Sequence, residues 1–196
     1  MTQNNLLTQV SNCVICEPQL PLGARPVVQF NPSARILIAG QAPGLKVHKT
    51  GIPFDDASGQ RLRQWLGLDK DDFYDATKIA ILPMGFCYPG KGKSGDLPPR
   101  KECAPTWRAE LLAALPNIKL TIVLGKYAQA YHLPHTKHLP LTELVKSWRE
   151  YWPAILPLPH PSPRNNIWLA KNPWFERDVV PQLCDAVQSI LNREDG

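Results

Sequence analysis

A run of six residues near the C-terminal end combines side chains that could bind an anionic group, His160-Pro161-Ser162-Pro163-Arg164-Asn165. An imidazole can donate a hydrogen bond to an oxygen that gains negative charge, and hydroxyl and guanidinium groups commonly bind phosphates. The two prolines restrict the backbone and lower the entropic cost of presenting these side chains. The alternative interpretation is a proline-rich turn with a surface arginine.

A second group of side chains suited to chemistry lies in the first third of the chain. Gly40-Gln41-Ala42-Pro43-Gly44 is followed by Gly51-Ile52-Pro53-Phe54-Asp55-Asp56-Ala57-Ser58-Gly59. The glycines allow the backbone to approach a ligand closely, the aromatic ring could stack on a flat ligand, and a carboxylate could stabilise a developing positive charge. Asp55 and Asp56 could instead cap the next helix, and Phe54 could belong to the core.

Four of the five cysteines form two pairs, Cys13-x2-Cys16 and Cys87-x15-Cys103. Two such pairs, brought together by the fold, suit either a tetrahedral zinc ion or a cubane iron–sulfur cluster. Spacing alone does not choose between them, and four ordinary thiols are a third interpretation.

Four short apolar runs predict the strands that must position these loops, at residues 34–39, 78–82, 119–124 and 154–158. Segments with helical apolar spacing alternate with these runs. The pattern therefore indicates an α/β fold with a parallel sheet covered on both faces. Ligands bind at the carboxyl edge of such sheets, where the Gln41, Cys87 and His160 loops should gather. The connection between residues 83 and 99 is predicted to be an irregular loop.

Composition narrows the class of protein. The 196 residues are 43% hydrophobic and 20% charged, and the net charge is +5, as expected for one globular domain that could bind a polyanion. No run of about 20 apolar residues and no signal peptide is visible, so no membrane partner is expected. We expect a cytoplasmic monomer whose cysteines are thiols or metal ligands.

The motifs together resemble those of a known family. Gly40-Gln41-Ala42-Pro43-Gly44 with His160-Pro161-Ser162 is similar to the two signature motifs of the uracil-DNA glycosylase superfamily. The cysteines and the Phe54 loop are most similar to its iron–sulfur bacterial and archaeal branches, and Arg164-Asn165 resembles the single-strand-selective monofunctional branch. The resemblance implies a three-layer α/β/α sandwich with a central four-stranded parallel sheet, formed by residues 1–196 as one domain.

The resemblance also implies roles for particular residues. The catalytic residues would be His160, which donates a hydrogen bond to the departing base, Asp56, which faces the sugar, and Gln41. Gln41 would also form the base pocket together with Ala42 and Phe54. The residues implied to contact DNA are Ser162, Arg164, Asn165, Lys91 and Lys93. The residues implied to bind the cluster are Cys13, Cys16, Cys87 and Cys103. The implied cofactor is a [4Fe-4S] cluster, with zinc as the alternative.

Two positions depart from the family pattern. Ala42 stands where the best-studied branch has an aspartate that activates water. Pro83 stands four residues before the third cysteine, where iron–sulfur members have an asparagine that reads the base, and proline offers neither a side-chain hydrogen bond nor an N–H. The resemblance therefore leaves the base undetermined.

The sequence predicts a monofunctional DNA glycosylase, which would hydrolyse the N-glycosidic bond of uracil or another deaminated or damaged base. One alternative is a non-catalytic iron–sulfur protein of the same fold that binds nucleic acid, which Ala42 and Pro83 favour. A further alternative is a zinc-stabilised hydrolase of free nucleosides.

Overall fold

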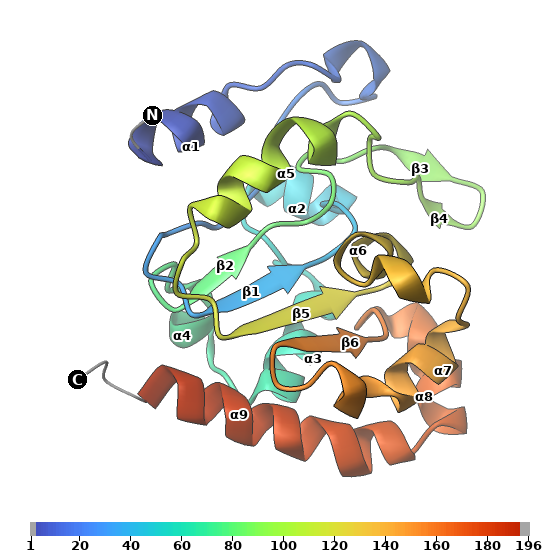
Figure 1. Ribbon diagram of the computed structural model, residues 1–196. Helices are drawn as coiled ribbons and strands as arrows, with labels where there is room; N and C mark the ends of the chain where they lie inside the picture. Colours follow the sequence, from blue (N-terminus) through green and yellow to red (C-terminus); the bar gives the residue numbers. More distant parts are fainter. Residues whose placement is uncertain (1–2, 193–196) are drawn as a thin grey trace.

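The computed structural model describes residues 3–192 and contains a parallel sheet with the strand order β2-β1-β5-β6 (Figure 1). The strands are β1 (Ile36–Ala39), β2 (Ile79–Ile81), β5 (Leu120–Leu124) and β6 (Ile155–Leu158). All four lie within the predicted apolar runs, and β1 pairs with both β2 and β5. The predicted four-stranded parallel sheet is confirmed.

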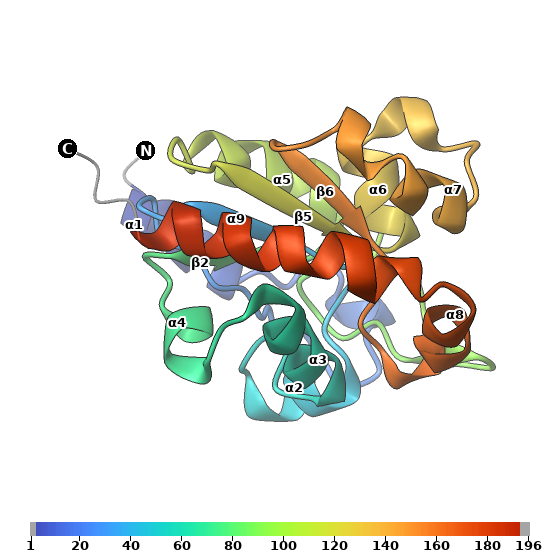
Figure 2. The same ribbon diagram turned by 90° about the horizontal axis from the view of Figure 1, so that it is seen from below.

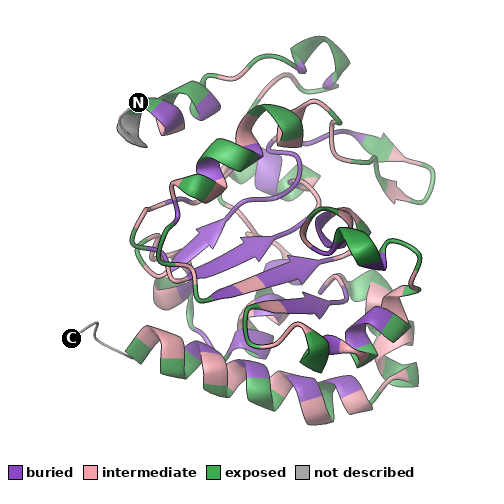
Figure 3. Ribbon diagram, viewed as in Figure 1, coloured by how far each residue is buried: buried purple, intermediate pink, exposed green. Residues whose placement is uncertain are grey.

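Both faces of this sheet are buried, because successive residues of each strand point to opposite sides. In β1, Ile36 and Ile38 enter one core and Leu37 and Ala39 enter the cores on the other face. Figure 3 shows the strands as the most buried part of the molecule. Consecutive apolar residues are therefore what a sheet between two helical layers requires.

Helices cover the two faces separately (Figures 1 and 2). One layer contains α3 (Ala57–Leu66), α4 (Lys70–Tyr74) and α9 (Val180–Asn192). The other contains α1 (Gln3–Ser11), α5 (Cys103–Ala113) and α6 (Lys126–His132). Three shorter helices, α2 (Leu45–Thr50), α7 (Leu141–Lys146) and α8 (Asn166–Lys171), connect these layers to the strands. The three-layer α/β/α architecture is confirmed.

The structure differs from the sequence prediction in the segment between residues 83 and 99. There the chain forms an antiparallel hairpin of β3 (Lys91–Gly92) and β4 (Gly95–Asp96). Strands of two residues are too short to show an alternating pattern, so no sequence pattern predicts them. The hairpin lies between Cys87 and Cys103 and reaches the carboxyl edge of the sheet.

The free edge of β2 is covered by an extended segment. Gln29 and Ile81 exchange two backbone hydrogen bonds (3.0 and 2.8 Å), and the Gln29 side chain donates to the Phe73 and Ile79 carbonyl oxygens (3.0 and 2.8 Å). This covering satisfies backbone groups that an exposed edge strand would leave unpaired. Among residues 3–192, no helix has the length and apolar character needed to cross a membrane.

Candidate active site

A cavity of about 570 Å³ opens at the carboxyl edge of the sheet. Its walls come from the loops after β1 and β6, from the start of α3 and from the β3–β4 hairpin. Most of the residues singled out in the sequence line it: Gln41, Ala42, Phe54, Asp56, His160, Ser162, Arg164 and Asn165. Lys91 and Lys93 lie on the neighbouring hairpin, exposed to solvent.

The loop after β1 is held to the two segments beside it. The Met84 and Gly85 amides donate to the Gly40 and Gln41 carbonyl oxygens, each at 2.9 Å. The Gln41 side chain donates through Nε2 to the Leu97 carbonyl oxygen at 3.1 Å. Gln41 therefore ties the hairpin region to the wall of the cavity.

Phe54 has an unusual backbone conformation. Its φ of 55° is the only positive φ of a non-glycine residue in the described part of the chain, and such a conformation costs on the order of 1–3 kcal/mol. Gly59 makes it accessible, because a Cβ at position 59 would lie 1.7 Å from the Phe54 carbonyl oxygen. The Phe54 ring packs edge-on against Phe73, with 6.3 Å between the centroids, and its Cζ lies over Gly40. Packing against Phe73 and Gly40 thus holds the ring at the cavity wall, despite the unfavourable backbone conformation.

Asp56 both caps a helix and lines the cavity, two roles that the sequence analysis gave as alternatives. It is the N-cap of α3, and its Oδ1 accepts a hydrogen bond from the Gly59 amide at 2.9 Å. It also lines the cavity, whereas Asp55 does not. The capping bond fixes the carboxylate, so its negative charge has a defined place at the cavity wall.

His160 is held by its own loop. The Asn165 side chain donates to the His160 carbonyl oxygen at 2.6 Å, and the Ser162 hydroxyl accepts from the Arg164 amide at 3.3 Å. Burial lowers the pKa of the His160 imidazole below its usual value, and the negative charge of Asp56 partly opposes this. The ring is therefore neutral at pH 7 and carries one N–H donor and one acceptor.

Sequence reasoning missed Arg61, which fastens this loop to α3. Its guanidinium donates to the Ser162 carbonyl oxygen at 3.1 Å and to Asn166 Oδ1 at 2.8 Å. The partners lie about a hundred residues away in the chain, so no local pattern marks this arginine. Arg61 thereby fixes the distance between the Asp56 and His160 walls.

Arg164 extends from the same loop to the hairpin. Its Nη1 donates to the Ser94 carbonyl oxygen at 3.4 Å, a long hydrogen bond. The contact needs glycine at position 95, where φ is +148° and a Cβ would lie 2.3 Å from Nη1. Arg164 therefore spans the mouth of the cavity.

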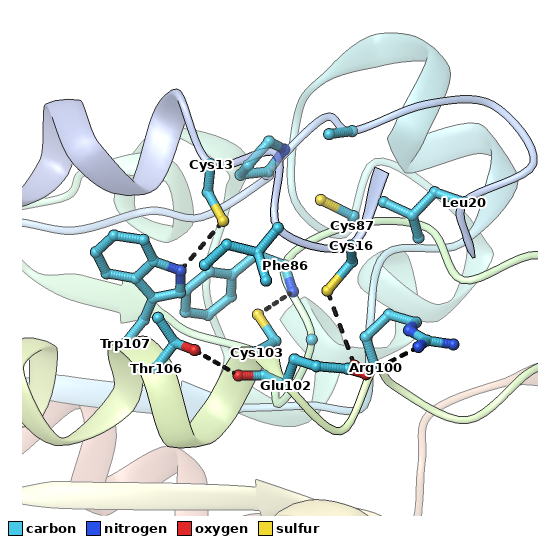
Figure 4. A pocket seen from close by; sticks show the side chains of 14 residues that line it. Cys13, Cys16, Leu20, Phe86, Cys87, Arg100, Glu102, Cys103, Thr106 and Trp107 are labelled. Carbon is cyan, nitrogen blue, oxygen red and sulfur yellow. Dashed lines mark hydrogen bonds and ion pairs between the residues drawn. The ribbon is translucent and has the colours of Figure 1, made fainter. Parts of the chain in front are cut away.

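The four paired cysteines line a second pocket (Figure 4). Cys13 and Cys16 follow α1, Cys87 follows β2, and Cys103 begins α5. The Trp107 indole N–H donates to Cys13 Sγ at 3.3 Å. Within residues 3–192, no three His, Cys, Asp or Glu side chains lie close enough together for one metal ion.

The environment of these sulfurs is apolar but supplies N–H donors. Burial raises the pKa of the Cys87 thiol to about 11 and that of Cys103 to about 12. The Phe86 amide donates to Cys103 Sγ at 3.4 Å. Such N–H···S bonds stabilise negative charge on sulfur and orient metal-binding thiolates. The pocket therefore brings the four sulfurs together with two N–H donors, the Phe86 amide and the Trp107 indole.

A buried arginine lies behind the cavity wall. Arg108 on α5 is 1% exposed, and its Nη1 donates to the carbonyl oxygens of Leu82 (2.9 Å) and Pro83 (3.1 Å). Burial lowers its pKa to about 10, so it stays cationic at neutral pH. Burial and the Arg108 charge lower the pKa of His132 to about 4, so the neutral ring accepts from Arg108 Nη2 at 2.7 Å. Arg108 therefore holds the backbone carbonyl groups of Leu82 and Pro83 in place from behind, while Pro83 itself lines the cavity.

Comparisons with known proteins agree with one another in the family that they indicate. The sequence model of the uracil DNA glycosylase superfamily matches residues 27–184. A type-4 uracil-DNA glycosylase from Sulfurisphaera tokodaii is 27% identical over 104 residues, which cover 51% of this chain and 44% of that protein. The match therefore spans less than half the length of this relative.

A similar solved structure is also known. It is a solution NMR structure of a candidate uracil DNA glycosylase from Methanosarcina acetivorans. The TM-score is 0.45 and the identity 17%, with 80% of this chain and 94% of that chain covered.

The strained Phe54 loop predicts that Gly59→Ala destabilises the protein. The added methyl would overlap the Phe54 carbonyl oxygen, so we expect a loss of about 1–3 kcal/mol in the free energy of unfolding, measured in urea. Gly40→Ala is the matched control, because its added carbon would meet Phe54 Cζ at an ordinary 3.6 Å. Equal stabilities of the two variants would contradict this account of the loop.

The buried guanidinium predicts that Arg108→Met lowers the free energy of unfolding by about 1–3 kcal/mol, because two buried carbonyl groups lose a donor. The control is Arg177→Met, which removes an arginine whose side chain is 73% exposed. This control should leave the urea midpoint nearly unchanged. A fully stable Arg108→Met variant would show that the two carbonyls find other donors.

Proposed function

Because the chain belongs to the uracil DNA glycosylase superfamily, we propose that it hydrolyses the N-glycosidic bond of a deaminated or damaged base in DNA. Uracil is one candidate base. The observation that supports this most is the grouping of His160, Asp56, Phe54 and Gln41 around one cavity at the carboxyl edge of the sheet.

The chemistry of this bond explains why such a grouping would be effective. As the bond breaks, positive charge develops on the sugar and negative charge on the departing base. A neutral His160 can donate its N–H to the base oxygen that becomes negative. Its lowered pKa suits this role, because the donor needs no added proton at pH 7.

Asp56 and Phe54 would act on the two halves of the nucleotide. The capped carboxylate of Asp56 would stabilise the positively charged sugar through its charge. The Phe54 ring, held by its packing against Phe73 and Gly40, would stack on the extruded base, and stacking accepts any base. Pre-set positions matter here, because groups that need no rearrangement stabilise the transition state most.

Pro83 affects which bases the cavity could accept. Pro83 lines the cavity without a side-chain donor or N–H, and its carbonyl oxygen is bound by Arg108. A site that hydrogen-bonds to a base strongly rejects bases that lack the matching groups. A site without such hydrogen-bonding groups discriminates less between bases. We therefore propose that this protein accepts more than one base.

Contacts to the DNA backbone would come from the rim of the cavity. Ser162, Asn165 and Arg164 lie on one side, and Lys91 and Lys93 on the exposed hairpin opposite. Cationic side chains at a rim bind phosphates, so DNA binding should weaken as the salt concentration rises. Arg164 spans the mouth and could fill the place of the extruded base.

We further propose that Cys13, Cys16, Cys87 and Cys103 bind a [4Fe-4S] cluster. All four sulfurs line one pocket, and the backbone and indole N–H groups beside Cys103 and Cys13 suit thiolate ligands of a cluster. When bound, the cluster would link the segment after α1 to α5 and stabilise the fold. Reduced cysteine ligands fit a reducing compartment, in line with the predicted cytoplasmic location.

The proposed reaction can be tested on single- and double-stranded oligonucleotides that contain uracil, hypoxanthine, xanthine or a methylated base. We expect abasic sites at one or more of these bases. His160→Ala should lower the single-turnover rate by roughly 10²–10³-fold with little change in DNA affinity, because affinity comes mainly from phosphate contacts. The wild-type rate should not depend on His160 titration above pH 7.

Other outcomes would support the alternatives. DNA binding without cleavage of any base would support a non-catalytic nucleic-acid-binding protein. Cleavage of free nucleosides without salt-dependent DNA binding would support a nucleoside hydrolase.

The proposed cluster predicts that anaerobically purified protein is brown and contains iron and sulfide. Cys87→Ser should lower the yield of folded protein, because metal-binding free energy contributes to folding. Cys184→Ser is the matched control, since Cys184 donates to the Trp65 carbonyl oxygen on the other face of the sheet. A colourless protein with one zinc ion per chain would contradict the cluster.

A further inference from the structure

A second carboxylate, that of Asp96, lines the cavity in addition to that of Asp56. It lies on β4 of the hairpin, while Asp56 begins α3. Its Oδ2 would lie 3.5 Å from a Cβ placed on Gly44, so the side chain reaches from the hairpin to the loop after β1. The cavity therefore has acidic groups on two walls.

The carboxylate of Asp96 differs from that of Asp56 in its bonding. Asp56 is committed to capping α3 through Oδ1. Among residues 3–192, no hydrogen bond or close ion pair holds the carboxylate of Asp96. Three charges act on it from a distance: Asp56 across the cavity, Arg164 from the motif loop and Lys91 from β3. Asp96 can therefore accept a hydrogen bond from a molecule in the cavity.

Asp96 is exposed to solvent, yet its surroundings raise the pKa of its carboxyl group. Desolvation raises its pKa above the usual value, Asp56 adds to this increase, and Arg164 and Lys91 oppose it. A carboxylate with a raised pKa is a better proton acceptor than one with the usual value.

Its backbone is held on both sides. The Leu97 carbonyl oxygen, one residue further on, accepts from Gln41 at 3.1 Å, and the Leu97 amide donates to the Gly90 carbonyl oxygen at 2.8 Å. On the other side, the Ser94 carbonyl oxygen accepts from Arg164 at 3.4 Å. Asp96 is thus positioned by contacts to both motif loops.

Hydrolysis needs an attacking water as well as a stabilised sugar, and Ala42 leaves the loop after β1 without a carboxylate for it. We propose that Asp96 is the general base that accepts the proton of the attacking water. This inference rests on the proposed glycosylase function. The water oxygen forms a bond to C1′ while the C1′–N bond breaks, and the bonding electrons leave with the base. The water proton moves to Asp96, and the departing anion accepts the hydrogen bond of His160.

The test compares Asp96→Asn with wild type in single-turnover assays from pH 4.5 to 8.5, on whichever base the wild type cleaves. We expect a rate roughly 10²–10⁴-fold lower, with unchanged DNA affinity, because only proton transfer is lost. The wild-type rate should fall as the pH drops and Asp96 becomes protonated. Asp96→Asn should lose the part of this acidic limb that protonation of Asp96 causes, which a merely structural role would not remove.

Two further measurements separate catalysis from folding. Asp71→Asn, on the exposed surface of α4, is the matched control and should cleave at the wild-type rate. Added formate should partly restore cleavage by Asp96→Ala, because a small carboxylate can replace a missing base but cannot repair a misfolded chain.

The outcomes distinguish the two proposals. Cleavage by Asp96→Asn within threefold of wild type, or an unchanged acidic limb, would overturn the role of Asp96 and leave the glycosylase function intact. A wild-type protein that cleaves no base would overturn the glycosylase function, and the role of Asp96 with it.

Discussion

The site depends on the continuation of the β1–β2 pairing beyond the ends of the strands. The Leu82 amide donates to the Ile38 carbonyl oxygen at 3.0 Å, and the Met84 and Gly85 amides donate to Gly40 and Gln41 at 2.9 Å. These bonds carry the regular geometry of the sheet into two loops that would otherwise be free to separate. One loop forms the wall of the cavity and the other leads directly to Cys87. The cavity and the cysteine pocket are therefore parts of one hydrogen-bonded unit.

Arg108 strengthens this unit from behind at an electrostatic cost. A buried guanidinium loses most of its hydration, and the described part of the chain offers it no carboxylate partner. It is compensated by the Leu82 and Pro83 carbonyls and by the neutral ring of His132. The backbone at Pro83 is therefore held from behind. The cavity wall at this position is fixed even though it carries no side-chain donor.

Features that depend on local sequence patterns could be predicted from the sequence. Contacts between residues far apart in the chain could not. The strands were predictable because each is an apolar run, and many of the cavity residues because they lie on the loops that follow β1 and β6. Arg61 and Arg108 were not, because their partners are remote in the chain. The conformation of Phe54 was also hidden, since it is permitted by the absence of a side chain at Gly59. The roles of the site residues were predicted from family resemblance, and they stay predictions.

The β3–β4 hairpin has a consequence for how such proteins can diverge. Its two ends join Cys87 and Cys103, which lie in one pocket, and neither of its strands pairs with the central sheet. Insertions or substitutions within the exposed hairpin, residues 91–96, would leave the sheet and the packed cores unaltered. They would change which groups reach the mouth of the cavity. The hairpin is therefore the segment through which evolution could alter substrate range at little risk to folding.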